Sequence, residues 1–500
     1  MSLTCITNLP PVETATLAYP QVRNYIGGKI SDSHAAQLDV LSPLDGSTIS
    51  TVPLSGPDEL DRAVQAAKAV FDQWSALTIK DRTQVFYRLR SILERDIDEL
   101  ATLVQIENGK TLDEAKAEVL KGMELCEFAC SLPALLNDEI QEVSKGVECR
   151  TMHVPIGVVA SITPFNFPHM VPMWTIPNAL VLGNCMILKP SEQTPISAGR
   201  ISEMLKEAGL PDGVFNVVHG DKTIVEAICD HPGIEAVSFV GSTKVAKIVY
   251  RRSTSNLKRC VALGGAKNHL IVLPDANVEM AAENIAASMS GCAGQRCMAA
   301  SAMVGVGKVD HIVNRLCEVA RAIVPGKNLG SVISKEAKER IERYIDEAEA
   351  AGAKVLVDGR KTVVKGKEGG FYVGPTVIDY VTPDMKIAKE EVFGPVLSIT
   401  RTNDLDEAIK IENSSNYGNA SSVYTQNGSM ADYVMERVSA GMVGVNIGVP
   451  VPREPFSFGG WNESRFGVND ITGKSSIQFW TKLKKRTTKW NREAWVDWTS

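Results

Sequence analysis

Between residues 150 and 265, short apolar runs alternate with segments of helical periodicity, and this alternation constrains the fold most. The five runs read, in order, HVPIGVVASIT, NCMILKP, VFNVVHG, AVSFVG and RCVALGG. Strands separated by helices form βαβ units, which build a parallel sheet with helices on both faces. We therefore predict a doubly wound α/β domain whose ligands bind at the carboxyl ends of the strands.

The segments on either side extend this pattern. Residues 1–54 have the turns and short apolar runs of an irregular arm, and residues 57–132 have the three- to four-residue periodicity of amphipathic helices. A second α/β segment runs from Ala266 to about Gly448. A chain of 500 residues has room for two or three such domains.

Composition narrows the function classes. The 53 basic and 59 acidic residues give a net charge of −6, so the chain lacks the basic footprint of a nucleic-acid binder. The apolar run Val171–Leu188 contains Pro172 and Pro177, which fit a membrane span poorly. The N-terminus shows no secretory signal, and ten irregularly spaced cysteines favour a reducing compartment. We expect a cytoplasmic protein with no membrane or nucleic-acid partner.

Cys297 is the first candidate for chemistry. It ends the glycine-rich loop Gly291–Cys297 and follows Arg296, and a thiol beside a fixed cation has a lowered pKa and is a good nucleophile. Inert packing is the alternative for any of the ten cysteines. Cys126 and Cys130 have helical spacing, but no second pair completes a metal site, so we expect no metal.

Five ordered motifs resemble the aldehyde dehydrogenase superfamily over roughly residues 25–480. They are TPFNFP at Thr163–Pro168, ILKPSEQTP at Ile187–Pro195, FVGST at Phe239–Thr243, GQRCMA at Gly294–Ala299 and EEVFGPV at Glu390–Val396. The resemblance implies an α/β fold with two doubly wound parallel-sheet α/β domains plus a small oligomerisation arm. It assigns 1–130 and 151–264 to an NAD-binding domain, 265–448 to a catalytic domain, and 131–150 with 476–500 to the arm of a homodimer or homotetramer.

The resemblance also implies a covalent mechanism. Cys297 matches the nucleophile that adds to an aldehyde. Asn166 matches the residue whose amide, together with the Cys297 backbone N–H, stabilises the resulting oxyanion, a contribution of about 10²–10³ in rate. Hydride then passes to NAD and leaves a thioester on the enzyme.

Several matched positions imply NAD binding. Lys189 and Glu192 match contacts to the adenosine ribose, and the carboxylate there favours NAD over NADP; a surface ion pair is the alternative. Gly241 and Ser242 match the pyrophosphate site, and Glu391, with Phe393 beside it, matches a contact to the nicotinamide ribose. Thr163 and Phe165 of the first motif complete the expected cofactor-binding set.

One departure separates this chain from hydrolytic members of the superfamily. Those members place a glutamate about 34 residues before the nucleophile, where this chain has Leu263. Water, with a pKa of about 15.7, needs a base or a metal to attack at neutral pH, whereas a thiol, with a pKa of about 8.5, supplies some thiolate by itself. We therefore expect coenzyme A to take the acyl group.

The segments GAKNH (Gly265–His269), NFPHMVPMW, GVPVP and FGGW resemble the CoA-acylating methylmalonate/malonate-semialdehyde dehydrogenase branch. That branch oxidises a 3-oxo acid and, after loss of CO₂, releases propanoyl-CoA or acetyl-CoA. Arg296 matches one arginine that binds the substrate carboxylate, and Lys121 stands where the branch usually has a second. A solvated helix lysine is the alternative for Lys121.

Phe167, Trp174 and Phe458 match the aromatic wall of the substrate tunnel, with core packing as the alternative. Other functions stay open at this point. The same fold could oxidise another small aldehyde, with either CoA or water as acceptor. A non-catalytic NAD-binding protein and a thiol protease are more remote possibilities.

Overall fold

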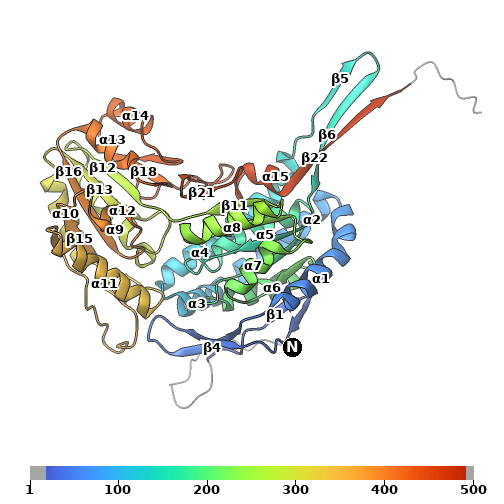
Figure 1. Cartoon of the computed structure of the whole chain (residues 1–500), viewed down its shortest axis with the longest axis horizontal. Helices are drawn as coiled ribbons and strands as arrows, with labels where there is room; N and C mark the ends of the chain where they lie inside the picture. Colours follow the sequence, from blue (N-terminus) through green and yellow to red (C-terminus); the bar gives the residue numbers. More distant parts are fainter. Residues whose placement is uncertain (1–17, 491–500) are drawn as a thin grey trace, which may run out of the picture.

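Two parallel sheets organise the chain, and the computed structural model describes them within residues 18–490 (Figure 1). The first sheet has the order β2-β1-β9-β8-β7-β10-β11-β21. Its central five strands, β9 to β11 in that order, are parallel, and β1, β2 and β21 extend the sheet antiparallel. The strands are β1 (Asn24–Ile26), β2 (Lys29–Ser31), β7 (Val158–Ile162), β8 (Cys185–Lys189), β9 (Phe215–Val217), β10 (Ala236–Val240), β11 (Arg259–Leu263) and β21 (Arg465–Phe466).

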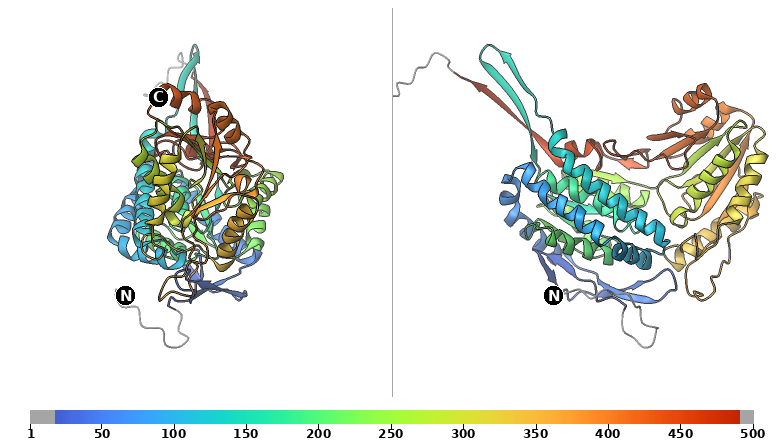
Figure 2. Two further views of the ribbon diagram at one scale, coloured as in Figure 1. Left: turned by 90° about the vertical axis from the view of Figure 1, so that its left-hand side faces the viewer. Right: turned by 180° about the vertical axis from the view of Figure 1, so that it is seen from behind.

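Helices cover both faces of this sheet. After β7 the chain adds β8 and β9 on one side of β7, and it then returns to add β10 and β11 on the other side. One face carries α1 (Pro57–Ala76), α7 (Lys222–Asp230) and α8 (Thr243–Ser255), which lie in front in Figure 1. The other face carries α5 (Met170–Val181) and α6 (Ile196–Glu207). Outside these pack α2 (Ile79–Arg95), α3 (Ile97–Asn108) and α4 (Leu112–Leu135), seen from behind in Figure 2.

The second sheet has the order β14-β15-β16-β13-β12-β18-β19 and is parallel except at β14. Its strands are β12 (Asn268–Val272), β13 (Ala300–Val306), β14 (Lys354–Val357), β15 (Thr376–Asp379), β16 (Val396–Thr402), β18 (Ala420–Tyr424) and β19 (Met442–Val445). Two apolar clusters, one on each face, bury four of its helices, and a third cluster holds the other two. The helices of this part are α9 (Val278–Ser290), α10 (Asp310–Arg321), α11 (Lys335–Ala350), α12 (Lys386–Lys389), α13 (Leu405–Asn413) and α14 (Gly428–Met435).

A three-stranded arm projects from the body (Figures 1 and 2). It consists of β5 (Ile140–Ser144), β6 (Val147–Pro155) and β22 (Thr481–Lys489), with β6 in the middle. The remaining elements are the hairpin β3 (Gln37–Leu41) and β4 (Thr48–Pro53), the pair β17 (Tyr417–Gly418) and β20 (Trp461–Asn462), and α15 (Ser475–Trp480).

The prediction of parallel α/β sheets is confirmed, and all five strands expected between residues 150 and 265 are present as β7 to β11. The segment boundaries differ in places. Residues 131–135 continue α4 instead of starting a strand, and residues 475–480 form α15 before β22 begins. Strand β21, from the C-terminal part of the chain, pairs with β11 of the first sheet. The expected segments at 1–17 and 491–500 lie outside the described residues.

Asn184 ties three segments near the first sheet together. Its fully buried amide lies between α5 and β8, and its Oδ1 accepts the backbone N–H groups of Ile156 and Gly157 at 2.8 and 3.2 Å. Its Nδ2 donates to the carbonyls of Ala179 and Trp480 at 3.0 and 2.9 Å. One side chain thus satisfies backbone groups from the root of the arm, the end of α5 and the end of α15.

We predict that Asn184→Ala destabilises the protein, because it leaves four buried backbone groups without these partners. The expected cost is about 3 kcal/mol, which lowers the thermal midpoint by several degrees in differential scanning fluorimetry. Asn314→Ala, on the exposed side of α10, is the control and should leave the midpoint in place. Equal midpoints for the two variants would contradict this role for Asn184.

Candidate active site

The loop that carries Cys297 lies between α9 and β13 and is held close to the segment after α12. A one-turn helix at Gly291–Gly294 begins it, and Cys292 and Ala293 there have positive φ angles of 51° and 53°. Gly294 has a φ of +70°, and a Cβ on it would lie 2.0 Å from the carbonyl oxygen of Gly394. Only glycine permits this approach, which brings the Cys297 loop beside the Glu391–Gly394 segment.

Two asparagines fix the position of Cys297. Asn268 and Asn419 donate their Nδ2 groups to the Cys297 carbonyl at 2.8 and 2.9 Å. Asn268 begins β12 and Asn419 immediately precedes β18, and these two strands are neighbours in the second sheet, so Cys297 is anchored at the amino ends of the two strands. Asn268 lies in the GAKNH segment, which gives that motif a structural role at the nucleophile.

The electrostatic prediction for Cys297 is wrong in direction. Burial raises the pKa of its thiol to about 12, and the nearby Glu391 carboxylate raises the pKa further. Arg296 acts in the opposite sense, but its guanidinium is turned elsewhere: Nε donates to the Cys292 sulfur at 3.3 Å and Nη2 lies 3.5 Å from Glu114. Although Arg296 is next to Cys297 in sequence, its guanidinium therefore does not contact the Cys297 sulfur.

Asn166 faces the same loop. Its buried side chain donates from Nδ2 to the carbonyl of Gln295 at 2.9 Å, two residues before Cys297. The backbone behind it is held by Lys110, whose Nζ donates to the Asn166 carbonyl at 2.9 Å. The structure thus brings together the two residues that the sequence analysis expects to act on the carbonyl group.

Lys110 and Glu118 are site residues that the sequence reasoning missed. They form an ion pair with both side chains fully buried, and Glu118 Oε1 also accepts the N–H groups of His169 and Met170 at 2.8 and 3.0 Å. The Lys110 ammonium also lies over the Phe167 ring, 4.2 Å from its centroid. Nothing in the sequence marked this pair, because a lysine and a glutamate eight residues apart around a helix start are common.

The expected cofactor-binding residues lie at the carboxyl ends of adjacent parallel strands. Thr163 follows β7, Lys189 ends β8, and Gly241 follows β10. The chain order in this sheet reverses between β7 and β10, and ligands of such sheets bind at this point. Lys189 pairs with Glu192 at 2.8 Å. Ser242 is the N-cap of α8 and makes no side-chain cap bond, so its side chain leaves the first N–H groups of this helix uncapped, and such N–H groups can bind an anion. This set of groups fits a dinucleotide.

Glu391 lies between these strands and Cys297. Its Oε1 accepts the N–H of Ala266 at 2.9 Å, and burial raises its pKa to about 7. Burial lowers the pKa of the neighbouring Lys267 to about 8, and its Nζ has no hydrogen-bond partner within residues 18–490. Phe393 meets Phe165 edge to face with ring centroids 5.9 Å apart. Lys267 was not singled out from the sequence, although it lies inside the quoted GAKNH motif.

The three aromatic residues expected to bind substrate lie in two places. Trp174 and Phe458 pack with ring centroids 4.7 Å apart, whereas Phe167 packs on Lys110. Lys121 is not a free cation: its Nζ lies 2.6 Å from Glu454 and 2.9 Å from Glu124.

Leu263 is buried at the end of β11, and residues 261–266 carry no ionisable side chain. Within the described part of the chain, no cluster of three or more His, Cys, Asp or Glu side chains could hold a metal ion. No helix there is long and apolar enough to span a membrane.

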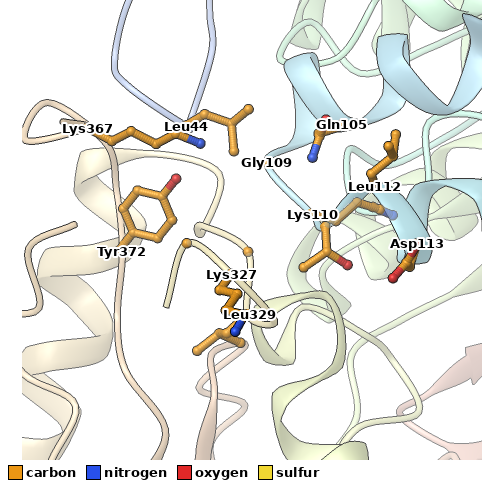
Figure 3. A pocket seen from close by; sticks show the side chains of 13 residues that line it. Leu44, Gln105, Gly109, Lys110, Leu112, Asp113, Lys327, Leu329, Lys367 and Tyr372 are labelled. Carbon is orange, nitrogen blue, oxygen red and sulfur yellow. The ribbon is translucent and has the colours of Figure 1, made fainter. Parts of the chain in front are cut away.

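A cavity of about 180 Å³ lies elsewhere, where the Leu44 loop meets the start of α4 and residues 326–330 (Figure 3). Lys110 lines it, but none of the residues that the sequence analysis expected to bind cofactor or substrate does.

Comparisons with known proteins agree with this geometry. The family model described as "Aldehyde dehydrogenase family" matches residues 30–486. Malonate-semialdehyde dehydrogenase 1 of Geobacillus kaustophilus is 44% identical over 478 residues, which cover 94% of this chain and 98% of the relative. Malonate-semialdehyde dehydrogenase 2 of Bacillus thuringiensis is 43% identical and covers 96% and 100%.

Solved structures extend the likeness to three dimensions. The methylmalonate-semialdehyde dehydrogenase of Oceanimonas doudoroffii superposes with a TM-score of 0.93 at 40% identity, covering 95% of this chain and 99% of that one. A Sinorhizobium meliloti protein solved in complex with NAD gives the same TM-score and identity and covers 96% and 99%. The motifs, the two-sheet fold and these matches over nearly the whole length together show that the chain belongs to the aldehyde dehydrogenase family.

Proposed function

We propose that this protein is an NAD-dependent, CoA-acylating dehydrogenase of malonate or methylmalonate semialdehyde. The products are acetyl-CoA or propanoyl-CoA, with loss of CO₂. The observation that carries the proposal is the identity of 43–44% with malonate-semialdehyde dehydrogenases over at least 94% of this chain. The geometry around Cys297 supplies the chemistry described next.

In the first half-reaction the Cys297 sulfur forms a bond to the aldehyde carbon as the thiol loses its proton. The Asn166 amide and the Cys297 N–H donate to the oxygen, which gains the negative charge. Bound NAD would supply the hydride acceptor, and loss of the hydride would leave the carbon attached to the sulfur as a thioester. Lys189, Glu192, Gly241 and Ser242 would hold the dinucleotide, and the Glu192 carboxylate would repel a 2′-phosphate.

The second half-reaction removes the acyl group. The thioester formed from a 3-oxo acid carries a carboxylate β to its carbonyl. The carbon–carbon bond to this carboxylate can break, which releases CO₂ and leaves an enolate that the thioester stabilises. A proton then adds to the enolate carbon. The CoA thiolate forms a bond to the carbonyl carbon, and Cys297 leaves as a thiolate that recovers its proton.

Leu263 favours CoA over water as the acceptor. The side chain is aliphatic and buried at the end of β11, and its neighbours at positions 261–266 carry no base. A thiol needs less assistance than water because its pKa is about seven units lower.

A hydrolytic dehydrogenase is the second candidate, and one observation favours it. Glu391 lies close enough to raise the pKa of Cys297, and its own pKa is raised to about 7 by burial, within the range suited to a general base. The proposed contact of Glu391 with the nicotinamide ribose would occupy this carboxylate while NAD is bound.

We further propose a cytoplasmic homodimer or homotetramer. All nine cysteines in the described part of the chain are free, which suits a reducing compartment. Among the described residues, strand β22 pairs with β6 alone, which leaves its outer edge for another strand, and Leu483 of β22 is exposed.

The acceptor is tested by turnover with and without CoA. We expect sustained NADH formation from malonate semialdehyde only when CoA is present, and a product with the mass of acetyl-CoA. Without CoA, formation should stop after about one NADH per active site, since the thioester has no acceptor. Full turnover without any thiol, abolished by Glu391→Gln, would instead support the hydrolytic candidate.

The covalent step is tested by Cys297→Ala. This variant should lose NADH formation entirely while it binds NAD with the affinity of the wild type, measured by isothermal titration calorimetry. Cys149→Ala, in the arm, is the control and should retain activity. NADH formation by Cys297→Ala at the wild-type rate would rule out the thioester.

The raised pKa predicts how Cys297 responds to pH. Because deprotonation requires pH values above neutrality, alkylation by iodoacetamide in the absence of NAD should accelerate about tenfold per pH unit from pH 7 to 9. Glu391→Gln removes a negative charge, lowers the pKa of Cys297 and should speed alkylation at pH 8 by about threefold to tenfold. Peptide mass spectrometry follows this site separately from the other cysteines.

Glu390→Gln is the matched control, because its carboxylate accepts the Tyr344 hydroxyl instead of facing the nucleophile. It should leave the alkylation rate unchanged. An alkylation rate for Cys297 that does not change between pH 7 and 9 would show that the thiolate is the resting form.

A further inference from the structure

One face of α4 runs along the active site. Glu114, Glu118 and Lys121 are spaced four and three residues apart, so they lie on one side of the helix. Glu114 accepts the N–H of Cys292 at 2.6 Å, in the loop that carries Cys297. Glu118 accepts the N–H groups of His169 and Met170, just after Asn166. Lys121 therefore continues a row of side chains that contact the catalytic loops.

The partner of Lys121 comes from the segment that carries the aromatic wall. Glu454 lies 2.6 Å from the Lys121 ammonium, and its side chain is only 14% exposed. Four residues later, Phe458 packs against Trp174 of α5. The ion pair thus connects α4 to the segment whose aromatic ring covers α5, beside the proposed path of the substrate.

The charges at this end of the site are balanced within the protein. Lys121 also contacts Glu124, which is 44% exposed, at 2.9 Å, and Arg453 approaches Glu124 at 3.9 Å. Arg296 has Glu114 as its own carboxylate partner. Both cations that the sequence analysis expected to bind a substrate carboxylate therefore already face a carboxylate of the protein.

We propose that Glu454 is a specificity-determining residue, which competes with the substrate carboxylate for Lys121. The inference rests on the proposed function and deepens it. An anionic aldehyde must displace Glu454 from Lys121 or lie near its negative charge, whereas an uncharged aldehyde of the same length avoids both costs. Glu454 therefore weakens the preference of the enzyme for a 3-oxo acid over a neutral aldehyde.

The test compares KM for malonate semialdehyde and for propanal with NAD and CoA present. Glu454→Gln keeps the size of the side chain and removes its charge. We expect its KM for malonate semialdehyde to fall about fivefold relative to its KM for propanal, because Lys121 is released. Glu127→Gln, an exposed α4 residue that pairs with Arg90, is the matched control and should leave the ratio of the two KM values unchanged.

Lys121→Met should change the ratio of the two KM values in the opposite direction. It removes the cation and leaves Glu454, so the ratio of KM for malonate semialdehyde to KM for propanal should rise by about tenfold or more. This variant also provides the test if Glu454→Gln fails to fold. In the double variant, Glu454→Gln should shift the ratio less than it does in the wild type, since Lys121 is no longer there to be released.

A KM ratio that stays at the wild-type value in both single variants would overturn the inference and show a purely structural ion pair. In that case the wild-type enzyme still oxidises malonate semialdehyde, so the proposed function stands. A wild-type enzyme that oxidises propanal but no malonate semialdehyde would overturn both.

Discussion

The buried ion pair between Lys110 and Glu118 is the interaction on which the arrangement of the active site depends. It joins the start of α4 to the loop before α5, and its two charges also bind the Asn166 carbonyl and the His169 and Met170 amides. A charge with 0% exposure is tolerated only when such partners surround it. One turn earlier on α4, Glu114 accepts the Cys292 N–H and so connects α4 to the loop that carries Cys297.

This framework places the nucleophile in a site that disfavours its charged form. Burial and Glu391 raise the pKa of Cys297, and Arg296, the nearest cation in sequence, contacts Cys292 and Glu114 instead. Both effects favour the protonated thiol over the thiolate at neutral pH. In the proposed mechanism, donors to the carbonyl oxygen of a bound aldehyde would supply a place for the negative charge. Lys267, whose Nζ makes no hydrogen bond within residues 18–490, and Arg340 both act to lower the pKa of the Glu391 carboxyl.

Much of the fold could be predicted because it follows local rules. The five strands β7 to β11 were each marked by an apolar run, and the parallel order followed from the helices between them. The sequence motifs also led to Cys297, Asn166, Glu391 and Lys189, which lie at strand ends and loops. Lys110, Glu118 and Glu454 escaped notice, because a lysine or glutamate in a helix or loop reads as a solvent-exposed charge until its neighbours are known.

The sequence by itself determined the two-sheet architecture and the family, and it singled out the residues that we propose for the covalent chemistry, since periodicity and motifs are local properties of the chain. Only the tertiary structure decided how charges are paired. The contact between Lys121 and Glu454 spans 333 residues of sequence, and that between Arg296 and Glu114 joins the Cys297 loop to α4. Side-chain pKa values and substrate preference depend on such long-range neighbours, because electrostatic energy is set by distance and burial in space rather than by position in the chain.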